Sequence, residues 1–124
     1  MQDNKDFKKQ LSQRAYQFAR DVIVLVDKFP SKRAAWVVTD QLLRAAMSIG
    51  ANIIEAQAAS SRKDFINFLH HALKSANETK FWLALAKDVA SNEHEKINAL
   101  LREAHELANI LGSSLSTLKG KKQA

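Results

Sequence analysis

Apolar residues recur every three or four positions through four long segments of this sequence, and this spacing constrains the fold more than any other feature. After Pro30, for example, steps of 4, 3, 4 and 3 residues separate Leu42, Ala46, Ile49, Ile53 and Ala56. Such a stripe covers one face of a helix that packs against neighbours along its whole length. The same spacing elsewhere predicts four helices, at about residues 6–28, 32–58, 62–90 and 93–119.

Few residues interrupt these helices. The 124 residues include one Pro and three Gly, far fewer than folds rich in turns contain. Pro30 ends the first helix, because it disfavours helical geometry in the residue before it. Ser31 and Ser61 are expected to cap the next two helices, and Asn92 with Glu95 is a predicted capping box for the last one.

The length and the short connections predict the arrangement of the helices. A chain of 124 residues buries one hydrophobic core, and short loops join antiparallel neighbours. The sequence therefore predicts an all-α fold, an antiparallel up-down four-helix bundle in which residues 1–124 form a single domain. Gly50 and Gly112 fall inside helices, where each costs about 1 kcal/mol relative to Ala. They are either tolerated substitutions or positions where helices approach closely.

A second, polar line runs beside the apolar stripe of the helix after Pro30. It contains Arg44, Ser48, Asn52 and Glu55, mostly short hydrogen-bonding groups instead of the Lys and Glu of a solvated face. In an antiparallel hairpin joined by a short loop, Arg44 faces Glu78 of the next helix. We therefore predict a partly buried structural polar seam with an Arg44–Glu78 ion pair. A catalytic role for these polar residues is the less common alternative in a helical core.

The net charge of +6 and the isoelectric point near 9.7 favour a polyanionic partner, most often nucleic acid. The up-down topology places most of this charge at one end of the bundle. A basic cluster that serves only solubility is an equally common explanation of such a charge. Exposed aromatic side chains for base stacking are not expected, because most Phe residues lie on core stripes. The predicted nucleic-acid-binding residues are Lys5, Lys8, Lys9, Lys32, Arg33, Arg62, Lys63, Lys119, Lys121 and Lys122, the last two in a predicted basic tail at residues 120–124.

Signatures of catalysis and of metal binding are missing from the sequence. No Glu has a His three residues later, as di-metal bundles require, and no His pair has the spacing of a zinc site. There is no glycine-rich phosphate loop and no nucleophile elbow. We predict no enzyme activity, no catalytic residue, no cofactor and no metal. With no cysteine, no signal peptide and no apolar run of about 18 residues, a cytoplasmic protein without a membrane partner is expected.

The polar line belongs to a longer motif that resembles a known family. The segment Asp40-Gln41-Leu42-x-Arg44-Ala45-Ala46-x-Ser48-Ile49-x-x-Asn52-Ile53-x-Glu55 is similar to the signature of the bacterial four-helix-bundle proteins, also called 23S rRNA intervening-sequence proteins. Supporting matches are Phe29-Pro30 and Phe65-Ile66-x-Phe68-Leu69-x-x-Ala72-x-x-Ser75-x-x-Glu78. The resemblance covers nearly the whole chain.

The resemblance implies a homopentamer of bundles. It also implies kinship with the accessory variability proteins of diversity-generating retroelements, basic pentamers that bind nucleic acid and a reverse transcriptase. Leu111-Gly112-Ser113 resembles those proteins. The sequence departs from the family at Ala56 and Lys74, where Gly is usual, and at Ser31-Lys32-Arg33, where the family is acidic. Because basic residues at a helix N-terminus oppose the helix dipole, Lys32 and Arg33 are interpreted as contacts for a partner.

These observations predict a cytoplasmic, non-enzymatic, oligomeric bundle that binds RNA or structured DNA through a basic surface, with little sequence preference. The alternative is a protein–protein assembly adaptor without a nucleic-acid role, which an apolar patch left exposed on the oligomer would favour. An enzyme ranks third, because it requires a cleft with convergent polar groups.

Overall fold

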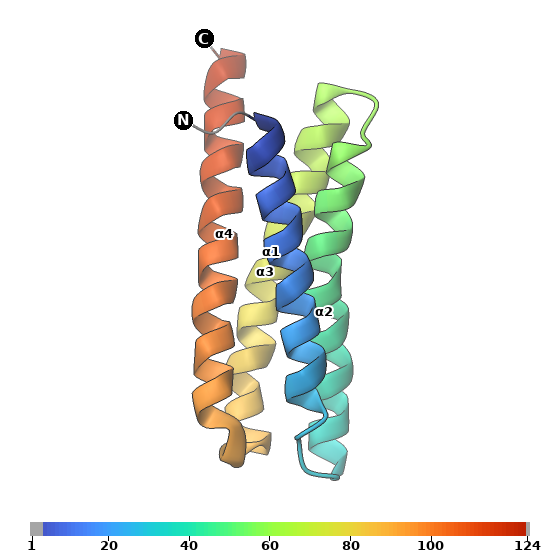
Figure 1. Cartoon of the computed structure of the whole chain (residues 1–124), viewed down its shortest axis with the longest axis vertical. Coiled ribbons are helices and arrows are strands. Elements are labelled where there is room, and N and C mark those ends of the chain that lie inside the picture. Colours follow the sequence, from blue (N-terminus) through green and yellow to red (C-terminus); the bar gives the residue numbers. More distant parts are fainter. Residues whose placement is uncertain (1–3, 124) are drawn as a thin grey trace.

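The computed structural model describes residues 4–123, with side chains for residues 5–120, and contains four long helices (Figure 1). They are α1 (Asn4–Val26), α2 (Arg33–Gln57), α3 (Arg62–Val89) and α4 (His94–Gln123), with a single 3-10 turn, η1 (Ser91–Glu93), before α4. The helices run up and down beside one another, and no strand occurs among the described residues. The predicted all-α four-helix fold is confirmed.

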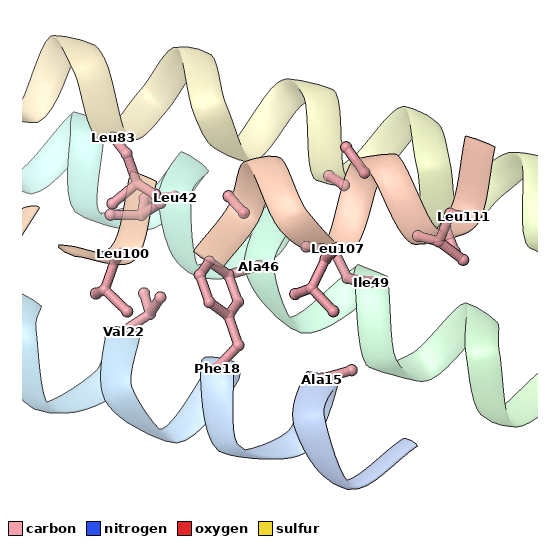
Figure 2. Close-up of a cluster of buried hydrophobic side chains, with 14 of the residues drawn as sticks. Ala15, Phe18, Val22, Leu42, Ala46, Ile49, Leu83, Leu100, Leu107 and Leu111 are labelled. Atoms are coloured by element: carbon pink, nitrogen blue, oxygen red, sulfur yellow. The ribbon is translucent and has the colours of Figure 1, made fainter. Parts of the chain in front are cut away.

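The predicted apolar stripes form the core. Phe18 and Val22 of α1, Leu42 and Ile49 of α2, and Leu83 of α3 are fully or almost fully buried. Figure 2 shows these side chains pointing toward one another, together with Leu107 and Leu111 of α4. The stripe of α1 is less buried at its start, where Phe7 is 38% exposed, whereas Leu25, Ala90 and Ile97 at the opposite end of the bundle are at most 2% exposed. The hydrophobic core therefore extends to the end of the bundle that holds Leu25 and Ile97, and it is open at the end that holds Phe7.

The helix boundaries differ from the predicted ones for local reasons. Ser61 caps α3 as predicted, because its Oγ accepts a hydrogen bond from the Asp64 amide at 3.1 Å. The predicted cap at Ser31 is wrong: α2 begins after Lys32, which has extended backbone and makes no side-chain cap. The predicted capping box at Asn92 is wrong too, since Asn92 lies within η1 and its side chain reaches Glu93.

The backbone of α4 continues through Gln123, so residues 120–123 are helical and not the predicted tail. No Pro interrupts this segment. Its lysines are favourable at a helix C-terminus, where the helix dipole is negative.

The two interior glycines occupy different surroundings, which gives a test of packing. A Cβ at Gly50 would lie 3.6 Å from Ala15 Cβ, an ordinary contact, whereas a Cβ at Gly112 would meet nothing within 4 Å. Because Ala is the better helix former, Gly112→Ala is expected to raise the free energy of unfolding by about 1 kcal/mol, and Gly50→Ala by about the same amount or less. Urea unfolding measures both. A loss of stability or of assembly at Gly112 would show that another surface packs there.

Candidate nucleic-acid interface

The topology gathers basic residues from three segments at one end of the bundle. The start of α1, the α2–α3 connection with the first turn of α3, and the end of α4 lie there together (Figure 1). We define the basic end as residues 5–9, 58–64 and 118–120. It carries six exposed cations and two carboxylates, Asp6 and Asp64. The six cations are Lys5, Lys8, Lys9, Arg62, Lys63 and Lys119. The side chains of Lys121 and Lys122 lie outside the described residues.

Lys32 and Arg33 do not join this cluster, although all ten residues were predicted as one binding set. They are exposed at the start of α2, at the opposite end of the bundle. The 25 residues of α2 separate the two ends by about 37 Å at 1.5 Å per residue. At this opposite end, Lys28 makes a side-chain contact with Lys96, which lowers the pKa of Lys28. A compact nucleic-acid contact therefore engages one end or the other.

Two cations of the basic end are held against other helices. The Arg62 Nη2 of α3 donates a hydrogen bond to the Leu118 carbonyl oxygen of α4 at 2.9 Å. The Lys8 ammonium of α1 lies 5.1 Å from the centroid of the Phe65 ring of α3, a cation–π distance. These contacts orient both charges across the junctions between helices, so that part of the basic end is preorganised.

The predicted polar seam is shorter than expected. Ser48 and Asn52 are half-buried between α2 and α3, and Asn52 Nδ2 donates to both the Ser48 carbonyl and Ser48 Oγ, at 2.9 and 3.0 Å. Ser75 of α3 donates to Ser48 Oγ at 3.0 Å and so links the two helices. Buried Thr79 continues the seam by donating to the Ser75 carbonyl at 2.7 Å. The seam thus consists of hydroxyl and amide groups, a structural arrangement.

The predicted Arg44–Glu78 ion pair is wrong, and Arg44, Glu55 and Glu78 are exposed. Arg44 pairs instead with Asp40, one turn away on its own helix, at 3.2 Å. The Glu78 carboxylate accepts a hydrogen bond from Trp82 Nε1, also on its own helix, at 3.0 Å. The antiparallel pairing rule places Arg44 and Glu78 at similar heights along α2 and α3. Both side chains point outward, however, so a partner one turn away on the same helix is easier to reach.

An unpredicted ion pair joins α1 to α4. Arg14 donates to the two carboxylate oxygens of Glu103, from Nε at 2.6 Å and from Nη2 at 2.9 Å. This hydrogen bonding raises the pKa of the Arg14 guanidinium. Because α1 and α4 are far apart in sequence, no local spacing signalled the pair.

The expectation that aromatic residues are not exposed is wrong as well. Tyr16, Trp36 and Phe81 are 67%, 62% and 59% exposed. They lie off the core stripes, on the outer faces of their helices. None of these three belongs to the basic end, where Phe7 is the exposed aromatic residue, at 38%. Their positions instead define two apolar surfaces on either side of α2.

The first apolar surface follows the junction of α1 and α2. Gln57 donates to the Lys8 carbonyl and to Ser12 Oγ, and Gly50 lies beside Ala15, so this edge of α2 faces α1. Exposed residues, and the half-buried Leu43, extend this edge outward, because positions three or four apart are neighbours on a helix. The α1–α2 surface consists of Tyr16, Ile23, Trp36, Leu43, Met47 and Ile54.

The second apolar surface lies on the opposite edge of α2, beside α3. Ser48 and Ser75 mark that edge by their hydrogen bond, and Trp82 lies seven residues beyond Ser75 on the same side of α3. The Phe81 and Trp82 rings contact each other edge to face, with centroids 5.0 Å apart. The α2–α3 surface consists of Val37, Phe81, Trp82 and Leu85.

Residues 4–123 contain neither a metal-binding cluster nor a helix that could span a membrane. No group of three or more His, Asp or Glu side chains there is placed to hold a metal ion. Among residues 4–123, none of the helices combines the length and the apolar character that crossing a bilayer requires.

Together these features define a small basic four-helix bundle with two apolar outer surfaces. The sequence profile of the 23S rRNA-intervening sequence protein family matches residues 8–113, so the chain belongs to that family. The fold is similar to the crystal structure of a protein of unknown function from the S23 ribosomal protein family of Bacteroides thetaiotaomicron VPI-5482. That protein is 35% identical with a TM-score of 0.77, and the match covers 85% of this chain and 97% of the other. No curated protein matches the sequence.

Proposed function

We propose that this protein is a non-enzymatic oligomeric bundle that binds RNA or structured DNA through its basic end, with little sequence preference. The observation that carries the proposal is the excess of cations there, six against two carboxylates in the described residues. Such a cluster attracts phosphates by counterion release and contacts no base edges. The names of the family and of the Bacteroides relative refer to ribosomal RNA and to the ribosome, which makes structured RNA the first ligand to test.

A salt series tests the basic end as the contact surface. We expect affinity for structured RNA and duplex DNA to fall steeply with salt, because each neutralised phosphate contributes about 0.9 to the logarithmic slope for B-DNA. The combined variant Lys8→Gln, Lys9→Gln, Arg62→Gln and Lys63→Gln should reduce that slope by about 3 or more. Fluorescence anisotropy at several salt concentrations measures both values.

The opposite end supplies a control with the same loss of charge. In the variant Lys28→Gln, Lys32→Gln, Arg33→Gln and Lys96→Gln, the basic end is unchanged, so the salt slope should stay close to that of the wild type. A slope reduced only in this second variant would show that nucleic acid contacts the end with Lys32 and Arg33 instead of the basic end. Absence of binding to both nucleic acids at low salt would reject the proposal.

We also propose that the bundles assemble as a homopentamer in the cytoplasm. The number five comes from the resemblance described above, and the two unlike apolar surfaces support a ring. When one surface of a subunit packs on a different surface of the next, the contact is heterologous and closes into a ring if the rotation permits. A mass in solution about five times the 13.9 kDa of one chain is the expected result.

Kinship with the accessory variability proteins of retroelements belongs to the same proposal and adds a reverse transcriptase as a candidate partner. Its support is the Leu111-Gly112-Ser113 segment near the end of α4. The second candidate function is a protein–protein assembly adaptor, which the exposed Phe81 and Leu85 favour. If the purified protein is monomeric and does not bind nucleic acid, the result favours the adaptor function, in which these apolar surfaces bind a different protein.

A further inference from the structure

A cavity of about 600 Å³ opens into the basic end of the bundle. The start of α1, the end of α2, the start of α3 and the last turns of α4 surround it. Pockets that bind small molecules have volumes of about 300–1,000 Å³ and combine apolar walls with a few polar groups. The cavity therefore has room for a small organic molecule.

The walls of this cavity are mostly apolar. Buried Leu11, Ile53 and Leu69 form its inner part, and Phe7 and Phe65 stand nearer the opening. Neither Asp nor Glu is present among the described residues that line it. The charged lining residues are Lys8 and Arg62, so both charged side chains in the described lining of the cavity are cations.

The two cations are held at the opening by contacts with the cavity walls. Lys8 lies over the Phe65 ring, 5.1 Å from its centroid. Arg62 uses one N–H group to bond the Leu118 carbonyl oxygen at 2.9 Å. A guanidinium carries five N–H donors, and both side chains are exposed, so each can meet an anion without being drawn out of water.

We propose that this cavity binds a small amphipathic anion, a carboxylate with an aliphatic or aromatic body. The apolar body fills the space between Leu11, Ile53 and Leu69, where it leaves water. The carboxylate remains at the opening and accepts charge-assisted hydrogen bonds from Arg62 and Lys8. This ligand goes beyond the proposed nucleic-acid contact, since a phosphate backbone has no apolar body to occupy the cavity.

Calorimetric titration of the full chain with decanoate tests the proposal, and decanol is the neutral analogue. We expect one saturable decanoate site per chain and weaker binding of decanol. Arg62→Gln should weaken decanoate binding about tenfold, the effect of losing one charge-assisted hydrogen bond. Lys63→Gln, which removes the same charge from the neighbouring exposed residue outside the cavity, should leave it unchanged.

Filling the cavity gives an independent test. Thr117 of α4 is exposed and lines the cavity, whereas its exposed neighbour Ser116 does not. Thr117→Trp should therefore abolish decanoate binding, and Ser116→Trp should retain it. Equal affinities for decanoate and decanol would overturn the role of the cations, and wild-type affinity in Thr117→Trp would overturn the location. Should Thr117→Trp fail to fold, the Arg62→Gln and decanol comparisons still decide the outcome.

Discussion

Replacing Phe18 with Ala is expected to lower the free energy of unfolding by about 3–5 kcal/mol, the range for removing a fully buried aromatic ring. Phe18 is 1% exposed and points from α1 toward the other three helices (Figure 2). Its partners in this layer include the small side chain of Ala46, which leaves the space that the ring occupies. Structure around a deleted core side chain relaxes only partly, so a cavity is expected to remain.

Urea unfolding at one fixed protein concentration measures this loss, since association itself stabilises a folded chain. Phe7→Ala is the matched control, because it makes the same change on the same helix at a residue that is 38% exposed. We expect Phe7→Ala to cost much less than Phe18→Ala. Similar losses in the two variants would show that Phe18 does not anchor α1 to the bundle.

Met47→Glu is expected to convert the proposed oligomer into monomers. Met47 is 45% exposed near the middle of α2, within the α1–α2 surface. If that surface packs on the next subunit, the substitution buries an unpaired carboxylate at every contact of the ring. An uncompensated buried charge costs several kcal/mol, and in a ring the penalty recurs at each interface. Light scattering after size-exclusion chromatography reports the mass, which should fall about fivefold to that of one chain.

Val24→Glu provides the control for this experiment. Val24 is 56% exposed on α1, and its neighbours at helical spacing are Arg20, Asp21, Asp27 and Lys28, so it lies outside both apolar surfaces. The same added charge there should leave the mass unchanged. Dissociation by both variants would point to net charge as the cause, and a monomeric wild type would contradict the assembly itself.

Assembly also bears on the strength of nucleic-acid binding. Subunits related by one ring axis present equivalent ends on the same side when their helices run roughly along that axis. Several basic ends would then contact one long nucleic acid together, and each contact after the first occurs at high effective concentration. Weak binding by one bundle is therefore compatible with tight binding by the oligomer.

Local patterns were sufficient for the helices and for the burial of their stripes. The spacing of Phe18 and Val22, or of Leu42 and Ile49, sets one face of each helix, because every residue turns the chain by a constant angle. Ser61 was also predictable as a cap from the local sequence, since its partner is the amide of Asp64, only three residues away. The basic end followed from connectivity, as short loops in an up-down bundle decide which termini share an end.

Tertiary structure alone decided the contacts that depend on how neighbouring helices are rotated and how closely they approach. Arg44 and Glu78 lie at similar levels on α2 and α3, yet both turn outward and bond within their own helices. Arg14 and Glu103 meet across α1 and α4, and the cavity beneath Lys8 and Arg62 requires four helix ends to surround one space. The apolar period of a helix specifies which of its faces is buried. It does not specify which neighbouring helices pack on either side of that face. That choice depends on packing among all four helices.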